Sequence, residues 1–255
     1  MPARRSGRST YRADMAVTRL WLVRHGESDG NVAASRAERA GSPVISLDTR
    51  EADVELSPVG KEQAEALTTW VENLDVPIDE YWVSPYRRAR QTLSLALGGE
   101  PPADRTLVDE RLRDRELGIL DLLTWKGVEE LHPEEAARRR HLGKFYHRPP
   151  GGESWADVAL RLRSFLGEAL DRPGPSVLVV AHDAVIMLAL YVLLGLDEHR
   201  LLAFAADHTV RNASVTELVR KDDGWKLVEF SGVDHLAAEG ADVTVHSGED
   251  DADHD

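Results

Sequence analysis

The stretch Ser176–Ala181 reads SVLVVA and is followed directly by His182 and Asp183. A short, continuous run of apolar and β-branched residues is typical of a strand that is buried on both faces of a parallel sheet. The apolar residues 184–194 come next, and their length fits a helix. The stretch therefore predicts a central strand with His182 at its carboxyl end.

Short apolar runs and helical patterns alternate outward from this strand, which indicates a layered α/β domain. Further strands are expected over residues 19–23 and 80–83, near Leu107, and in a closing hairpin over residues 214–220 and 225–230. One helix is expected to begin at Ser57-Pro58. Another is expected to begin at Ser84-Pro85 and to end at Leu97, because a serine cap followed by proline commonly opens a helix. Two more helices are expected over residues 133–142 and 154–170.

The composition limits the classes of function. The chain has 255 residues, 42% of them hydrophobic, which suits a single folded domain. Its 45 acidic and 31 basic residues give a net charge of −14, which disfavours binding to nucleic-acid backbones or to anionic membranes. Because there is no cysteine, disulfides, thiolate metal sites and a cysteine nucleophile are excluded. No apolar run reaches the roughly 20 residues of a membrane span and no secretory signal is evident, so a cytoplasmic location is expected.

The two ends of the chain carry opposite charges. Residues 1–18 are expected to form a disordered basic arm, residues 19–233 the single domain, and residues 234–255 a disordered acidic tail, since this last segment has no lysine or arginine. A translation start at Met15 would remove most of the basic arm, and the sequence leaves both starts open.

Two histidines, His25 and His182, each follow a predicted strand. Open α/β sheets bind ligands at the carboxyl ends of their strands, so the two side chains are expected to meet in one site. Taken singly, such a histidine is more often structural. Arg87 and Arg88 follow another strand end, in SPYRRARQT. An arginine pair on a helix is usually solvated, but at a strand end its guanidinium can bind a phosphate.

Four motifs, RHGESDGN, SPYRRARQT, LRDRELG and VVAHD, occur in this order along the chain. Together they resemble the histidine phosphatase superfamily, in its phosphoglycerate mutase-like branch, over roughly residues 20–218. The resemblance implies a three-layer α/β/α sandwich whose central sheet is mostly parallel with an antiparallel strand. It also implies a phosphomonoesterase that needs neither a metal nor a cofactor and acts on a small phosphorylated metabolite through a phosphohistidine.

The resemblance also implies the roles of individual residues. His25 would be the nucleophile, and Arg24, Arg88 and His182 would bind the phosphate, with further hydrogen bonds from Ser28 and Asn31. Arg87 would be a cation outside the phosphate pocket or on the protein surface.

The family acid lies four residues before the glycine of the third motif, which selects Asp114. This acid is usually glutamate, so the shorter aspartate leaves Glu116 as a rival. Asp183 replaces a glycine that often follows the second histidine, and we expect it to cap the next helix and turn away from the phosphate.

Phosphoryl transfer sets the expected protonation states. His25 must be neutral to attack, whereas His182 is expected to stay protonated beside the phosphate. The fixed charges of Arg24 and Arg88 would replace a metal ion. Asp114 must protonate the leaving alcohol, so burial and the substrate's charge are expected to raise its pKa and to give an acid-shifted pH optimum.

The alcohol part of the substrate is expected to contact the loop before and within PPGG. The candidate contacts are Lys144, Tyr146, Arg148 and Glu153, and a solvated basic loop is an equally good interpretation. The basic members would suit a substrate with a second anion.

Three functions remain open: a phosphatase, a phosphoglycerate mutase, and a phospho-ligand-binding or regulatory protein without turnover. The expected partner is a small phosphorylated substrate, with no nucleic acid and no membrane. A homodimer stays open, because one sequence does not give the oligomeric state.

Overall fold

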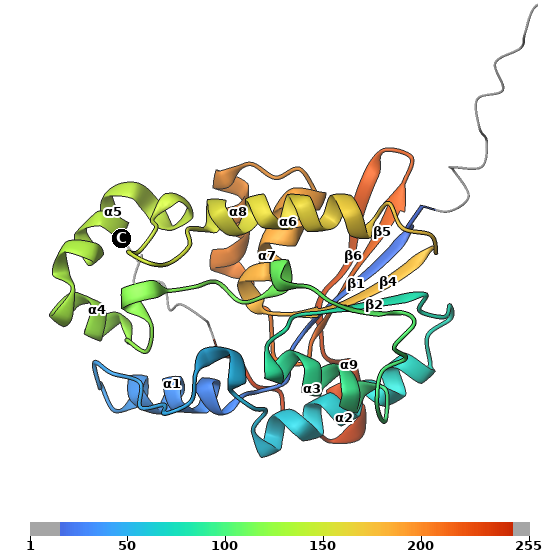
Figure 1. Ribbon diagram of the computed structural model, residues 1–255, viewed down its shortest axis with the longest axis horizontal. Coiled ribbons are helices and arrows are strands. Elements are labelled where there is room, and N and C mark those ends of the chain that lie inside the picture. The colour runs from blue at the N-terminus through green and yellow to red at the C-terminus, as the bar shows by residue number, and fades with distance from the viewer. Residues whose placement is uncertain (1–15, 247–255) are drawn as a thin grey trace, which may run out of the picture.

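A six-stranded mixed sheet forms the centre of the protein, and the computed structural model describes residues 16–246 (Figure 1). The strands lie in the order β3-β2-β4-β1-β5-β6. The four strands β3, β2, β4 and β1 are parallel, whereas β5 runs antiparallel to β1 and to β6. Their bounds are β1 Arg19–Arg24, β2 Glu80–Val83, β3 Thr106–Val108, β4 Ser176–Ala181, β5 Val215–Lys221 and β6 Gly224–Gly232.

Helices cover both faces of the sheet (Figure 1). One face carries α2 (Pro58–Glu72), α3 (Arg87–Ala96) and the short α9 (Asp234–Glu239), and the other carries α6 (Trp155–Ala169), α7 (Asp183–Leu193) and α8 (Glu198–Asp207). Alternate residues of one strand reach the two layers, because side chains along a strand point to opposite faces. In β4, Val177 and Val179 pack in the α6–α7 core, and Leu178 and Val180 pack in the α2–α3 core. The expected three-layer α/β/α architecture is confirmed.

Three more helices lie beyond the carboxyl ends of the central strands (Figure 1). They are α1 (Asp29–Arg39), α4 (Trp125–Leu131) and α5 (Pro133–Tyr146). The short 3-10 helices η2 (Glu51–Asp53), η3 (Glu110–Leu112) and η4 (Gly118–Leu120) lie in the long connections. Leu120, Val128 and Ala136 form a small separate core there.

Most expected elements are present, with one displaced helix start. Ser57 caps α2 as expected, since its side chain accepts a hydrogen bond from the Gly60 amide. The helix expected from Ser84-Pro85 begins two residues later, at Arg87, with Tyr86 as its cap. Ser84 is instead hydrogen-bonded to His182, so its hydroxyl has a partner in the site rather than in a helix.

The expectation of a solvated tail from residue 234 onward is wrong for residues 234–246. Residues Asp234–Glu239 form α9, which packs on α2, and Leu236 is fully buried. Burial of the Leu236 side chain in the core stabilises the folded position of this segment, even though the segment is acidic. Residues 247–255, and residues 1–15 of the expected basic arm with the alternative start Met15, lie outside the described residues. Within residues 16–246, no helix is long and apolar enough to cross a membrane.

Candidate active site

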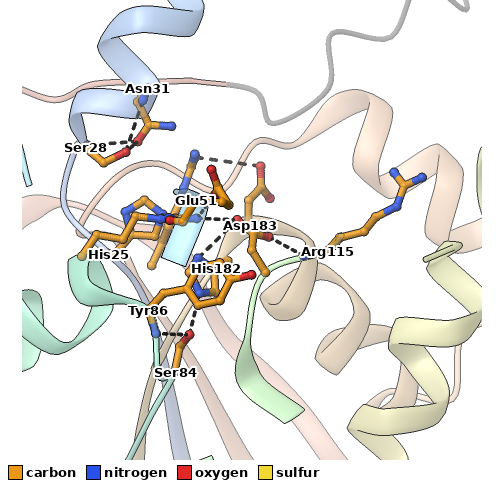
Figure 2. Close-up of polar contacts among 12 residues, drawn as sticks. His25, Ser28, Asn31, Glu51, Ser84, Tyr86, Arg115, His182 and Asp183 are labelled. Carbon is orange, nitrogen blue, oxygen red and sulfur yellow. Dashed lines mark hydrogen bonds and ion pairs between the residues drawn. The ribbon is translucent and has the colours of Figure 1, made fainter. Parts of the chain in front are cut away.

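His25 and His182 lie together at the carboxyl edge of the sheet (Figure 2). Arg24, the last residue of β1, pairs in register with Ala181, the last residue of β4, so the histidine after each strand is brought to the same place. The two imidazole centres are 5.2 Å apart. The sequence-based expectation that the two histidines meet is confirmed by this geometry.

His25 is held with one nitrogen available for attack. Its Nδ1 lies 2.7 Å from the Gly26 carbonyl oxygen, which makes Nδ1 the protonated nitrogen. Its Nε2 accepts a hydrogen bond of 3.1 Å from Nε of Arg88. Burial, together with the charges of Arg88, His182 and Arg24, holds the pKa of His25 well below 6.5, so the imidazole is neutral.

Two glycines fix the loop that carries His25. A Cβ on Gly26 would lie 2.4 Å from the Gly60 carbonyl oxygen, and a Cβ on Gly60 would lie 1.8 Å from that of Glu27. The two backbones therefore approach more closely than any other residue type allows. This contact joins the His25 loop to the first turn of α2.

Arg88, in the first turn of α3, is the most highly connected cation of the site. Besides its bond to His25, its Nη1 donates to the Glu51 carbonyl oxygen across 2.8 Å. Its Nη2 lies 2.6 Å from Oε1 of Glu51 and 3.1 Å from Oδ2 of Asp114. The side chain is 4% exposed. Arg87, in contrast, is 55% exposed and pairs with Glu55, which makes it a surface cation.

Arg24, which directly precedes His25 in the chain, is also buried. Its guanidinium donates to the carbonyl oxygens of Val210 and, across 2.7 Å, of His246. Asp183 does not turn away as expected, because its Oδ2 lies 3.8 Å from Nη1 of Arg24. As the first residue of α7, Asp183 is directed toward the nearest buried cation, whose charge attracts it.

His182 contacts both a serine and the candidate acid. Its Nε2 lies 2.8 Å from the Ser84 hydroxyl, and its Nδ1 lies 3.3 Å from Oδ2 of Asp114 (Figure 2). Burial lowers the pKa of His182 to about 4, although Asp114 acts in the opposite direction. The expected protonated imidazole is thus not favoured in this structure, because burial destabilises the charged form of His182 more than the Asp114 carboxylate stabilises it.

Asp114 is placed in the site and Glu116 is not. The Asp114 carboxylate contacts both Arg88 and His182. Burial alone would raise its pKa, but His182 and Arg88 outweigh burial and hold the pKa well below 3.8. This direction is opposite to the expected one, and a bound phosphate would have to reverse it. Glu116 accepts a hydrogen bond of 2.9 Å from the Tyr86 hydroxyl and is 46% exposed.

Ser28 and Asn31 bond to each other and cap α1. The Ser28 hydroxyl accepts from the Asn31 amide, and the Asn31 side-chain oxygen accepts from the Ser28 amide. The side-chain amide of Asn212 donates to the carbonyl oxygen of His25 across 3.2 Å and to Asn31 across 3.3 Å. Ser28 and Asn31 therefore support the His25 loop, and their contact with phosphate stays a prediction.

The residues expected to contact the alcohol have other partners in this structure. Nζ of Lys144 lies 4.7 Å from the ring centre of Trp155, and Tyr146 is 57% exposed. Arg148 pairs with Asp157, its Nε at 2.6 Å. The Glu153 carboxylate is bound by Arg113 at 2.7 Å and by Arg161 at 2.9 Å. A substrate contact for Lys144, Tyr146, Arg148 and Glu153 stays a prediction.

Sequence reasoning missed Glu51, Ser84 and Tyr86 as members of the site. Ser84 and Tyr86 stand inside the SPYRRARQT motif, so their closeness to Arg88 in the sequence could have indicated that they belong to the site. Tyr86 stacks edge-on against His182 at 5.2 Å and lies under the Arg88 guanidinium. Glu51 stands in a loop-rich stretch without a motif, and only the fold brings it to Arg88.

One group of metal-ligating side chains coincides with this site. Among the described residues, ligand atoms of His25, Asp114 and His182 all lie within 4.8 Å of one another. The set could hold a metal ion, but the guanidinium charges of Arg24 and Arg88, which lie close to His25, oppose a cation there. Independence of metal stays a prediction.

Comparisons with known proteins agree on the family. The model of the histidine phosphatase superfamily (branch 1) matches residues 20–232. A 6-phosphofructo-2-kinase/fructose-2,6-bisphosphatase 3 from Rattus norvegicus is 30% identical over 167 residues, which are 66% of this chain and 26% of that protein's length. A probable phosphoglycerate mutase from Yersinia enterocolitica is 26% identical and covers 82% of this chain and 88% of its own.

A solved structure of a mycobacterial glucosyl-3-phosphoglycerate phosphatase with VO3 superposes with a TM-score of 0.65. It is 28% identical, and the match covers 85% of this chain and 100% of that one. The similarity thus extends over nearly the whole described domain.

Proposed function

The chain belongs to the histidine phosphatase superfamily (branch 1), and we propose that it hydrolyses a small phosphorylated metabolite through a phosphohistidine on His25. The observation that carries this proposal is the state of His25. Its Nδ1 is turned to a carbonyl oxygen, and its unprotonated Nε2 lies among Arg24, Arg88 and His182.

In the first step, Nε2 of His25 attacks phosphorus and the bond between phosphorus and the ester oxygen breaks. Negative charge spreads over the equatorial oxygens, where Arg24 and Arg88 would stabilise it. Asp114 gives its proton to the departing alcohol oxygen. In the second step, water attacks phosphorus and the bond between phosphorus and Nε2 of His25 breaks. Asp114 takes a proton from that water, and inorganic phosphate leaves.

The proton on Asp114 is the most demanding part of this mechanism, because the free carboxyl has a lowered pKa. A phosphate bound to Arg88 would use the guanidinium charge that now stabilises the ionised carboxylate. It would also add negative charge next to Asp114, and both changes raise a carboxyl pKa. Substrate binding itself would therefore supply the conditions under which Asp114 can hold a proton.

Glu51 has a defined place in this sequence of events. Its carboxylate lies 2.6 Å from Nη2 of Arg88, so it occupies a donor that a phosphate oxygen would use. Phosphate and the Glu51 carboxylate compete for the same guanidinium, and substrate binding requires the carboxylate to move off Arg88.

Hydrolysis of p-nitrophenyl phosphate in excess EDTA tests the proposal. The parent protein is expected to turn over in EDTA, and His25→Ala is expected to lose turnover by a factor of about a thousand or more, since it lacks the nucleophile. His132→Ala, a substitution at the start of α5 outside the site, is the matched control and should retain activity. Turnover that survives His25→Ala would contradict the mechanism, and turnover lost in EDTA would contradict its independence of metal.

A phosphoglycerate mutase is the second candidate, favoured by the similarity to the Yersinia protein over 82% of the chain. The same phosphohistidine would then return its phosphoryl group to phosphoglycerate instead of to water. Incubation with isotopically labelled 3-phosphoglycerate separates the two: a phosphatase releases inorganic phosphate, and a mutase forms 2-phosphoglycerate.

A further inference from the structure

Three carboxylates surround the two arginines that would bind phosphate. Glu51 and Asp114 contact Nη2 of Arg88, and Asp183 lies 3.8 Å from Nη1 of Arg24. The fixed positive charge is therefore already balanced before a substrate arrives. Both histidines are neutral before a substrate binds, so they add no positive charge to the two guanidinium groups.

The proposed mechanism assigns proton transfer to Asp114 and uses neither Glu51 nor Asp183, and we call these two the acidic pair. Both are partly exposed, with side-chain exposures of 37% and 24%, whereas the arginines that they contact are 4% and 2% exposed. The acidic pair therefore lies on the solvent side of these arginines. Figure 2 shows both on the side of His182 opposite to Ser84. The Glu51 backbone is held to Arg88 through its carbonyl oxygen, so its carboxylate stays near the site when phosphate displaces it.

Neighbouring arginines are occupied by other groups. Arg113 and Arg161 bind the Glu153 carboxylate, and Arg148 pairs with Asp157. Arg115 donates to the carbonyl oxygen of Glu153 across 2.7 Å, and in Figure 2 its guanidinium points away from His25 and His182. The loop cations that could have balanced a second anion are therefore paired elsewhere.

We propose that the acidic pair, Glu51 and Asp183, makes the enzyme select phosphate monoesters whose alcohol part is cationic or uncharged and discriminate against alcohols that carry a second anion. This inference rests on the proposed phosphatase function and deepens it. A carboxylate on the substrate would approach two fixed carboxylates in a partly buried site, where like charges repel more strongly than in water. An ammonium group at the same position would be attracted by both.

The proposal also bears on the second candidate function, the phosphoglycerate mutase. Phosphoglycerate carries a carboxylate close to its phosphate ester, so the acidic pair would oppose it. The expected substrate class is the phosphate ester of an amino alcohol or a polyol.

A matched set of two-carbon esters tests this selectivity, because only the charge of the far end differs. The set is O-phosphoethanolamine with an ammonium, 2-hydroxyethyl phosphate with no charge and 2-phosphoglycolate with a carboxylate. For the parent protein, kcat/KM is expected to be at least about tenfold lower for 2-phosphoglycolate than for the other two. Glu51→Gln and Asp183→Asn should each reduce this ratio by several fold.

Asp53→Asn is the matched control, since Asp53 belongs to the same 3-10 helix as Glu51 but pairs with the exposed Arg50. It should keep the parent ratios. Equal kcat/KM values for the three esters in the parent would overturn the proposal. So would unchanged ratios in both Glu51→Gln and Asp183→Asn, and the two variants are independent if one of them does not fold.

Binding separates failure of this proposal from failure of the proposed function. The three esters are titrated calorimetrically onto His25→Ala, which does not need turnover, and the same order of affinity is expected. Selective binding without hydrolysis by the parent would contradict the phosphatase function alone. Hydrolysis of p-nitrophenyl phosphate without selectivity among the three esters would contradict the role of the acidic pair alone.

Discussion

Nε of Arg88 donates a hydrogen bond of 3.1 Å to Nε2 of His25, so the proposed phosphate-binding cation and the proposed nucleophile form one unit. The contact requires an unprotonated Nε2, and it places the guanidinium where the transferred phosphoryl group would develop charge. It also explains why the remaining donors of Arg88, on Nη1 and Nη2, face Glu51 and Asp114 rather than solvent.

Arg88→Lys tests this unit. Arginine can donate to His25 from Nε and to a phosphate from its two Nη atoms. Lysine keeps the charge but has a single nitrogen, so it cannot bind His25 and a phosphate in this way. We expect kcat for p-nitrophenyl phosphate to fall by about a hundredfold or more. Arg87→Lys, at the exposed neighbour that pairs with Glu55, should have nearly the parent activity. Similar losses in both variants would show that the contact with His25 is not what matters.

The pH dependence of kcat/KM reports the acid. Because the pKa of Asp114 is lowered, its carboxyl is ionised near neutral pH, and its protonated fraction grows as the pH falls. Burial and the neighbouring cations lower the pKa of His25, which keeps its imidazole neutral near pH 7. Activity toward 2-hydroxyethyl phosphate, whose alkoxide needs a proton to depart, should therefore rise from about pH 8 to about pH 5. Asp114→Asn should remove this rise and Glu116→Gln should retain it, whereas a flat profile in the parent would exclude Asp114 as the acid.

Gly60→Ala tests the close approach that fixes the His25 loop. The added Cβ would lie 1.8 Å from the Glu27 carbonyl oxygen, so the backbone must shift. We expect the free energy of unfolding in urea to fall by about 2 to 3 kcal/mol. Gly167→Ala, in α6, has no atom within 4 Å of its added Cβ and should raise the stability by about 0.5 to 1 kcal/mol. A fall in both variants would contradict the local origin of the effect.

Leu236→Ala tests whether residues 234–246 belong to the folded domain. Leu236 is fully buried in α9, so its truncation should lower the free energy of unfolding by about 2 to 4 kcal/mol. Val245→Ala, at a position that is 53% exposed in the same segment, should change stability by less than about 0.5 kcal/mol. A solvated tail would give equally small effects at both positions.

The sequence allowed the sheet and the main cluster to be predicted because their signals are local. The apolar run of β4 and the Ser57-Pro58 cap depend on neighbouring residues, and the histidines follow from the strand ends. The start of α3 was misplaced because Ser84 has two possible partners, a helix amide or His182, and only the fold decides between them.

Long-range contacts account for the rest of what was missed. Glu51 is 37 residues from Arg88 along the chain, and no local pattern indicates that they meet. Asp183 was expected to turn outward, because sequence gives the charge of a phosphate site but not the direction of each side chain. The pKa of Asp114 likewise depends on two partners, Arg88 and His182, that come from other elements.

If His25 carries the phosphoryl group between the two steps, the phosphorylated protein can be trapped. The protein is mixed with excess p-nitrophenyl phosphate, quenched within one turnover in alkali, where phosphohistidine survives, and digested for mass spectrometry. The account predicts a phosphoryl group on the peptide that contains His25, absent from His25→Ala. Turnover with no phosphoryl group on His25, or with one on another residue, would contradict it.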